Sequence, residues 1–292
     1  MGEQLSIRSC AVCINPDLDA GAVFSRRVIS ALLSRGIGVN VERRFNYYIG
    51  ELKNDVYLCN SLDDAITRSD VIIVLGGDGT MLEVCEKAAP HAKPLLGINL
   101  GHLGFLTTIE RERIDDIVLL TEGKFDIDER IMMDVTVRDN AISCRATALN
   151  EVTIMSRTPA VISSFYLDCD GGHVLDMSAD GVIVSTPTGS TAYSMSAGGP
   201  IIDPSTDVFC FTPMCAHALG SRPMIFSGSS ALSISARSRD GSDGAVAIVD
   251  GRSRMDLSNK AVVTVSKSNL TARFIRFGEN RFYDIVNTKL YK

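Results

Sequence analysis

The chain has 292 residues, of which 45% are hydrophobic and 22% are charged. This balance is that of a soluble globular protein and excludes a disordered chain, and the length suits one large domain or two of ordinary size. The formal net charge of -6 excludes a general attraction to nucleic acid or to an anionic membrane, so a phosphate site must be built locally.

The sequence also lacks the pattern of a membrane span or an export signal. No segment approaches the roughly 18 unbroken apolar residues of a transmembrane helix, and the richest run is Val71 to Leu75. Glu3 and Arg8 interrupt the region where a signal peptide would be continuously apolar. We therefore expect a cytoplasmic protein that acts on small molecules, without a nucleic-acid or membrane partner.

The cysteines and histidines do not form a metal-binding pattern. Cys10 and Cys13 make one C-x-x-C pair, which lies in a predicted strand from Arg8 to Ile14. Residues three apart on a strand point to opposite faces, so the two sulfurs would diverge. The histidines lack the spacing of zinc sites, and they lie at positions 91, 102, 173 and 217. We expect buried free thiols and no metal held by the protein.

Strand and helix signals alternate over the first 108 residues. The first predicted strand ends at Ile14, and a helix follows with Phe24, Val28 and Leu32 on one face and Gly36 as its stop. The next predicted elements are a strand, a helix, a strand, a helix and a strand, at residues 38–42, 62–68, 71–75, 80–89 and 94–98. This alternation predicts an α/β domain with a parallel, Rossmann-like sheet covered by helices.

After residue 125 the hydrophobic pattern changes to a period of two. Strands are predicted at 133–137, 164–168, 232–236 and 262–266, with Asp, Gly, Asn and Ser between them. This half is predicted to be an antiparallel β sandwich. We place an α/β domain at 1–123, ending in a connecting helix from residue 111, and a β-rich domain at 124–277. A tail at 278–292 could return to the first domain.

The first chemical signal is the strand Val71–Leu75, which runs into Gly-Gly-Asp-Gly-Thr and a helix. Glycine lets the backbone turn sharply and approach a ligand, and the helix N-terminus offers free N–H groups to phosphate. Asp78 stands out, because a carboxylate near phosphate needs a metal ion, a proton or a sugar hydroxyl to bind. The alternative is a tight turn in which Asp78 only caps the helix, and this segment alone does not separate the two.

The Gly-Gly-Asp-Gly-Thr segment is neither a Walker A loop nor a G-x-G-x-x-G fingerprint. It resembles a group of kinases that includes the NAD kinases, the diacylglycerol and sphingosine kinases, and the phosphofructokinases. Another part of the sequence must distinguish among these families.

The most informative stretch runs from Asp180 to Pro200. An apolar strand leads into a loop of hydroxyl-bearing and small residues with one aromatic, Tyr193. Such a loop can approach a ligand closely and hydrogen-bond to ribose or phosphate, and the tyrosine can stack on a purine. By composition alone, a Ser/Thr-rich turn with Tyr193 as a core residue is the favoured alternative.

The order of the motifs resembles the NAD kinase family. That family carries Asp-Gly, Ser-Thr-Pro-Thr-Gly-Ser-Thr-Ala-Tyr and Ser-Ala-Gly-Gly-Pro in this sequence, as residues 180–200 do. Residues 149–152 resemble its Asn-Glu motif, and residues 97–105 its second glycine-rich loop. The likeness spans roughly residues 71 to 252, and its long motif is highly specific.

The resemblance implies roles for individual residues. Asp78 would accept the proton of the ribose 2'-hydroxyl or position that group, with Gly79 beside the ligand. Asn150 and Glu151 would contact the adenosine, and Asp180 the nicotinamide carboxamide. The residues around the adenine and ribose would be Phe105, Thr191, Ala192, Tyr193, Ser194 and Ser196.

Two positions depart from the family pattern or vary within it. Ser178 stands where many members have a basic residue, so we expect no cationic contact there. Arg252 stands where the family varies, and it either contacts phosphate, helps to select NAD over NADH, or is a solvated surface residue.

The reaction implied is transfer of the terminal phosphate of ATP to the 2'-hydroxyl of the adenosine ribose of NAD, giving NADP. The resemblance further implies a divalent cation, Mg²⁺, that arrives with ATP, and a homodimer or homotetramer. We expect the Gly-Gly-Asp-Gly-Thr segment (the glycine turn) and the loop that carries Tyr193 (the tyrosine loop) to face each other around one dinucleotide. The rival interpretations are a lipid kinase and a sensor that binds NAD or NADP without catalysis.

Overall fold

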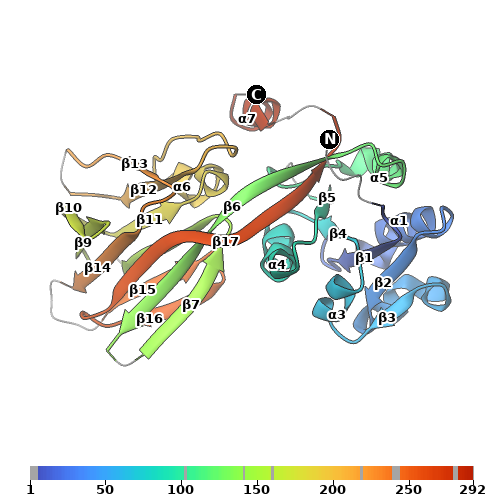
Figure 1. Cartoon of the computed structure of the whole chain (residues 1–292), viewed down its shortest axis with the longest axis horizontal. Helices are drawn as coiled ribbons and strands as arrows, with labels where there is room; N and C mark the ends of the chain where they lie inside the picture. Colours follow the sequence, from blue (N-terminus) through green and yellow to red (C-terminus); the bar gives the residue numbers. More distant parts are fainter. Residues whose placement is uncertain are drawn as a thin grey trace. The chain divides into compact units, whose positions relative to one another are not determined.

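The computed structural model of the chain describes residues 6–101, 104–140, 142–158, 161–217, 220–238, 244–278 and 282–291. Its internal contacts divide it into two compact units. The first unit comprises the chain up to Glu129 together with the segment from Ala272 onward, and the second comprises Arg130–Thr271. Two strands, β6 (Asp126–Asp139) and β17 (Val262–Arg276), contribute residues to both units (Figure 1).

The first unit contains a parallel sheet in the order β3-β2-β1-β4-β5. Its strands are β1 (Ser9–Ile14), β2 (Gly38–Glu42), β3 (Tyr57–Cys59), β4 (Val71–Gly76) and β5 (Leu95–Asn99). The end of β17 adds a further parallel pairing, in which Phe274 lies opposite Leu95. The prediction of a parallel α/β sheet is confirmed.

Helices cover both faces of this sheet because each face is apolar. On one face, α1 packs Val28, Ile29 and Leu32 against alternate residues of β1 and β4, and α5 joins the same cluster. On the other face, α3 and α4 contact each other and the sheet. The α-helices of this unit are α1 (Val23–Leu33), α2 (Asn46–Ile49), α3 (Leu62–Thr67), α4 (Asp78–Ala88), α5 (Ile117–Thr121) and α7 (Phe282–Leu290). Its 3-10 turns are η1 (Ala20–Ala22), η2 (Arg43–Phe45), η3 (Gly50–Asn54), η4 (Ala89–His91) and η5 (Arg111–Asp116).

The strand order reverses between β1 and β4, so the loops that follow these two strands leave the sheet side by side. Ile14 at the end of β1 lies opposite Leu75 near the end of β4. Asn15, the next residue, donates a hydrogen bond from Nδ2 to Thr80 Oγ1 at 2.9 Å. In open α/β sheets, ligands bind at this kind of crevice outside the carboxyl ends of the strands. The fold therefore places the glycine turn where a ligand site is expected.

The second unit is a sandwich of two antiparallel sheets around one apolar core. One sheet contains β10-β9-β14-β17 with β6 and β7, and the other has the order β13-β12-β11-β8-β15-β16. The bounds are β7 (Ile142–Ala148), β8 (Glu151–Ser156), β9 (Ser163–Cys169), β10 (Gly172–Ala179), β11 (Gly181–Ser185), β12 (Val208–Met214), β13 (Met224–Ser227), β14 (Leu232–Ser238), β15 (Ala245–Val249) and β16 (Ser253–Leu257). Leu232, Ile234 and Ala236 of β14 alternate into the core, as the period of two predicts. The predicted antiparallel sandwich is confirmed.

Strand β11 departs from this alternation because it is buried on both faces. The chain that follows it forms a 3-10 turn, η6 (Thr188–Thr191), and a short helix, α6 (Tyr193–Ser196), and both contact β11. The tyrosine loop is thus folded back onto the strand that leads into it.

The eight cysteines are free thiols, but they are not all buried. Cys10 belongs to the apolar cluster on the α1 face, and burial, with a smaller contribution from Asp70, raises the pKa of its thiol to about 12. Cys144 and Cys215 are exposed, which corrects the expectation of buried thiols for these two. Cys144 lies between Ser143 and Arg145 in an edge strand, whereas Cys215 has apolar neighbours in the sequence but lies in a loop after β12.

Candidate active site

Asp78 is the first residue of α4, and Gly77 is the N-cap. The Asp78 carboxylate does not cap its own helix. It accepts hydrogen bonds from the backbone N–H of Phe105, at 2.8 Å to Oδ2, and of Leu106, at 3.1 Å to Oδ1. The helix-cap interpretation of Asp78 is therefore wrong. The carboxylate instead joins the glycine turn to the second glycine-rich loop, and it stays half-buried at the carboxyl edge of the sheet.

One glycine allows this close approach of the two loops, and a second allows the tight turn before α4. A Cβ on Gly104 would lie 2.2 Å from Asp78 Oδ1, and a Cβ on Gly76 would lie 2.5 Å from Thr80 Oγ1. Both distances are far inside van der Waals contact, so any side chain at these positions would displace its neighbour. Leu100 N–H also donates to Gly76 O at 3.2 Å, which holds the start of the second loop against the end of β4.

Phe105 lies between Asp78 and the C-terminal helix of the same unit. Its ring centroid is 6.3 Å from that of Phe282, and Lys289 Nζ lies 4.3 Å from the Phe105 ring centroid. The ring is half-buried, whereas Gly79 on the first turn of α4 is exposed.

In the second unit, the Asn150–Glu151 motif is fixed by the turn after β15. The Asp250 carboxylate accepts three backbone N–H hydrogen bonds, from Leu149 at 2.8 Å, Asn150 at 2.9 Å and Glu151 at 3.0 Å. Asp250 has a positive φ of 48°, a conformation that Asp tolerates better than most residues. The turn thus sets the backbone from which Asn150 and Glu151 project.

The loop after β11 is bound to the same motif. Thr186 donates from N–H to Asn150 O at 2.9 Å and from Oγ1 to Leu149 O. A Cβ on Gly189 would lie 2.1 Å from Asn150 O, so glycine is required at this contact. The Asn-Glu motif and the start of the tyrosine loop therefore form one rigid cluster.

Glu151 carries the strongest electrostatic perturbation in this cluster. Its side chain is buried, with 7% exposed, and Oε2 has no hydrogen-bond partner within the described part of the chain. Burial, and to a smaller extent the charge of Asp250, raises the pKa of the Glu151 carboxyl to about 8. Near pH 7 this residue is mostly a neutral acid, and its free oxygen can pair with a hydroxyl of a bound ligand.

Buried hydroxyl groups hold the inner side of the tyrosine loop in place. Thr191 Oγ1 donates to Thr188 O at 3.2 Å, and the buried Ser194 hydroxyl lies 2.9 Å from Thr212 Oγ1 of β12. A Cβ on Gly199 would lie 2.4 Å from Ser194 Oγ. Ser194 therefore has a clear part in fixing the loop.

The outer side of the same loop faces solvent. Tyr193 is 43% exposed, Ser196 is exposed and Ala192 is half-buried. The interpretation of Tyr193 as a core residue is wrong, because η6 and Ser194 fill the space against β11 and leave the tyrosine outside. An exposed ring on a fixed loop can stack on a planar ligand.

Asp180 is not part of the cluster around Glu151. Ser185 of β11 lies opposite Glu151, whereas Gly181 lies opposite Met155 at the far end of the pair. At ~3.4 Å per residue, the five residues of β11 place Asp180 about 17 Å from the end of the strand beside Glu151. Arg252 is exposed on the turn after β15.

Comparisons with known proteins agree with these motifs. Residues 14–120 match the family model described as the ATP-NAD kinase N-terminal domain, and residues 149–277 match that of the ATP-NAD kinase C-terminal domain. The NAD kinase of Syntrophotalea carbinolica is 34% identical over 96% of each chain. That of Methanothermobacter thermautotrophicus is 34% identical over 94% of this chain and 93% of its own. The chain belongs to the NAD kinase family.

Solved structures of similar fold carry related names. An NAD kinase from Archaeoglobus fulgidus in complex with ATP has a TM-score of 0.74 and 26% identity, covering 97% of this chain and 98% of that one. Yeast NADH kinase complexed with NADH has a TM-score of 0.89 and 23% identity, covering 98% of this chain and 88% of that one, and this likeness supports the fold.

The sequence did not predict the contacts of several residues that build the site of this family member. Gly104, Asp250 and Thr186 act through contacts with residues 26 to 101 positions away. Gly104 and Thr186 lie in the family motifs, and Asp250 begins an Asp-Gly pair after an apolar strand, which is typical of a turn with positive φ. Its carboxylate contacts could not be read from the sequence.

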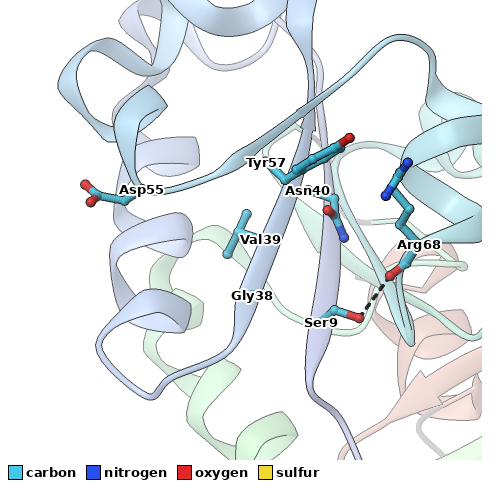
Figure 2. A pocket seen from close by; sticks show the side chains of 7 residues that line it. All are labelled: Ser9, Gly38, Val39, Asn40, Asp55, Tyr57 and Arg68. Carbon is cyan, nitrogen blue, oxygen red and sulfur yellow. Dashed lines mark hydrogen bonds between the residues drawn. The ribbon is translucent and has the colours of Figure 1, made fainter.

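A separate surface depression lies at the opposite edge of the first unit's sheet. Figure 2 shows it at the amino ends of β1, β2 and β3, with the Tyr57 ring beside the Arg68 side chain. Its lining residues are Ser9, Gly38, Val39, Asn40, Asp55, Tyr57 and Arg68. None of the sequence-predicted site residues lines it, so it is distinct from the edge that carries Asp78.

Proposed function

We propose that this NAD kinase family member transfers the terminal phosphate of ATP to the 2'-hydroxyl of the adenosine ribose of NAD, with Asp78 holding that hydroxyl. The observation that carries this proposal is the anchored Asp78 carboxylate. Two backbone N–H groups fix both of its oxygens, at the start of α4 and at the carboxyl edge of the sheet. A fixed carboxylate beside a helix N-terminus suits an acceptor hydroxyl next to phosphate.

The proposed reaction depends on alignment of the two substrates more than on covalent catalysis by the protein. Phosphoryl transfer passes through a loose transition state, so the enzyme contributes mainly by positioning and by neutralising charge. Asp78 would orient the hydroxyl in line with the phosphate and accept its proton late in the reaction. The first N–H groups of α4, which have no partners within the helix, would face the phosphates.

A divalent cation would reach the site as part of the ATP substrate. Within the described residues, no three or more His, Cys, Asp or Glu side chains are grouped as metal ligands. Mg²⁺ commonly binds through substrate phosphates and water with few protein ligands, so Mg²⁺ bound to ATP fits this chain.

The second unit supplies the proposed adenosine contacts. The neutral Glu151 and Asn150 would hydrogen-bond to the adenosine, and the exposed Tyr193 would stack on its base. The other proposed substrate contacts are Gly79, Phe105, Asp180, Thr191, Ala192, Ser194, Ser196 and Arg252.

The quaternary state and compartment belong to the same proposal. We expect a homodimer or homotetramer in the cytoplasm, which light scattering and cell fractionation can test. No helix in the described part of the chain is long and apolar enough to cross a membrane.

Replacing Asp78 with Asn tests the catalytic role. The amide keeps the size of the side chain but cannot accept the proton, so NADP formation from NAD, ATP and Mg²⁺ should fall by about 10²-fold or more. NAD binding measured by calorimetry should survive. Near-normal turnover would remove Asp78 from the chemistry, and a wild-type protein that binds NAD without forming NADP would be a sensor.

A further inference from the structure

Arg276 is the last residue of β17 and lies in the same unit as Asp78. Its Nη1 lies within hydrogen-bond distance of three acceptors in the segment directly after the second glycine-rich loop: Leu106 O at 3.2 Å, Thr107 O at 3.2 Å and Thr108 Oγ1 at 3.1 Å. Nε of the same guanidinium donates to Asp128 Oδ2 at 3.1 Å. The side chain is only 18% exposed, so these contacts are sheltered from water.

The loop that Arg276 holds is the loop that holds Asp78. Leu106 donates its N–H to Asp78 Oδ1, and its carbonyl oxygen accepts from Arg276. Thr108 closes the other end of the segment, because its hydroxyl donates to Ile275 O at 2.6 Å and its N–H donates to Gly97 O at 2.9 Å. The peptide units that orient the carboxylate are thus themselves oriented by β17.

We propose that Arg276 is a positioning residue for the reaction, acting through residues 105–108 on the orientation of the Asp78 carboxylate; this inference rests on the proposed role of Asp78. The planar guanidinium matches the task, because one nitrogen reaches the loop oxygens while another pairs with Asp128. Lysine has a single ammonium on a flexible stem and cannot hold both sides in the same geometry. Loss of the guanidinium contacts would let the N–H groups of residues 105 and 106 shift. The Asp78 carboxylate would then turn away from the acceptor hydroxyl.

Arg273 provides a matched control on the same strand. It also pairs with a carboxylate, with Nε 3.2 Å from Glu129 Oε1, and it also donates to a backbone carbonyl, from Nη1 to Ala92 O at 3.2 Å. These partners lie outside residues 105–108. Arg273→Gln therefore removes an ion pair with a carboxylate and a hydrogen bond to a carbonyl without touching the loop.

The test compares Arg276→Gln, Arg276→Lys and Arg273→Gln in the full chain, by steady-state kinetics with NAD and ATP. Arg276→Gln should lower kcat by about 10-fold or more while each KM stays within about two-fold, because an interaction made for the transition state is lost. Arg276→Lys should recover part of kcat, and Arg273→Gln should keep the wild-type kcat. Equal kcat values for Arg276→Gln and Arg273→Gln would overturn the inference.

A double-mutant cycle with Asp78→Asn separates positioning from a general structural effect. If Arg276 acts through Asp78, then Arg276→Gln should cause no further loss of residual rate in the Asp78→Asn background. A full additional loss there would overturn the inference. Should Arg276→Gln fail to fold by thermal melting, the cycle is run with Arg276→Lys and judged in the same way. Near-normal activity of Asp78→Asn would instead remove the proposed role of Asp78, so the two failures are distinguishable.

Discussion

The surroundings of the Glu151 side chain determine the pKa of its carboxyl group. The Glu151 carboxyl on β8 is buried and feels the charge of Asp250, so it ionises less readily than an exposed carboxyl. Burial is the larger cause of its raised pKa. Because the group stays protonated in the folded state while the unfolded chain ionises normally, Glu151 links protein stability to pH.

The stability of the protein should fall between about pH 4.5 and pH 8 through Glu151, whose folded pKa is about 8 against a reference value of 4.5. The stability present below the lower value is lost as the pH rises, because only the unfolded chain releases the proton in this window. Glu151→Gln should therefore become more stable than the wild type by up to about 4 kcal/mol near pH 8 and similar at pH 4.5. Denaturant unfolding across this range measures the difference, and a gap independent of pH would contradict the raised pKa.

Tyr193 is a residue whose exposed ring has a proposed binding role. Base-aromatic stacking is worth about 1–3 kcal/mol, so Tyr193→Ala should raise the KM for NAD by about 10-fold while kcat at saturation changes less. Tyr193→Phe keeps the ring and should behave like the wild type. An unchanged KM for NAD in Tyr193→Ala would argue against stacking.

At the scale of elements, two loops in the first unit work as one because glycine lets them touch. The start of α4 and the segment after β5 meet at Asp78, where Gly104 leaves room for the carboxylate. The contact depends on shape more than on buried apolar area, so a small added group should harm activity more than folding.

Gly104→Ala should lower kcat by about 10-fold or more, because its Cβ would lie 2.2 Å from Asp78 Oδ1 and must push the carboxylate aside. The matched control is Gly101→Ala in the same loop, where the nearest atom to an added Cβ is Leu18 Cδ1 at 4.0 Å. Steady-state rates and thermal melting of both variants make the comparison. Equal kcat values would show that Asp78 tolerates displacement.

Whole-molecule organisation was the most predictable part of this protein. The 3.6- and 2-residue periods of the two halves follow from which faces are buried, so the parallel sheet and the sandwich could be predicted. The glycine turn and the tyrosine loop were also found, because their residues are consecutive. Hydrogen bonds such as that from Arg276 to Leu106 could not be predicted. They join residues 170 positions apart and produce no periodic pattern in the sequence.

Helix boundaries and exposure were less predictable for local reasons. α4 begins at Asp78, two residues before the expected start, because Gly77 takes the extended N-cap position directly after β4. Tyr193 lies outside rather than in the core because the preceding turn and Ser194 fill the space against β11. The local backbone decides the first case, and packing against β11 decides the second.

The first unit is interrupted in the chain by the whole of the second, and its loop at Leu106 is tied down by Arg276. During synthesis on the ribosome, Asp78 is therefore made long before the strand that fixes its neighbours. At about 5–20 residues per second, translation needs roughly ten seconds or more to deliver that strand. A nascent chain paused within the second unit would contain the complete glycine turn. It would lack Arg276, which orders the segment at residues 106–108 beside that turn.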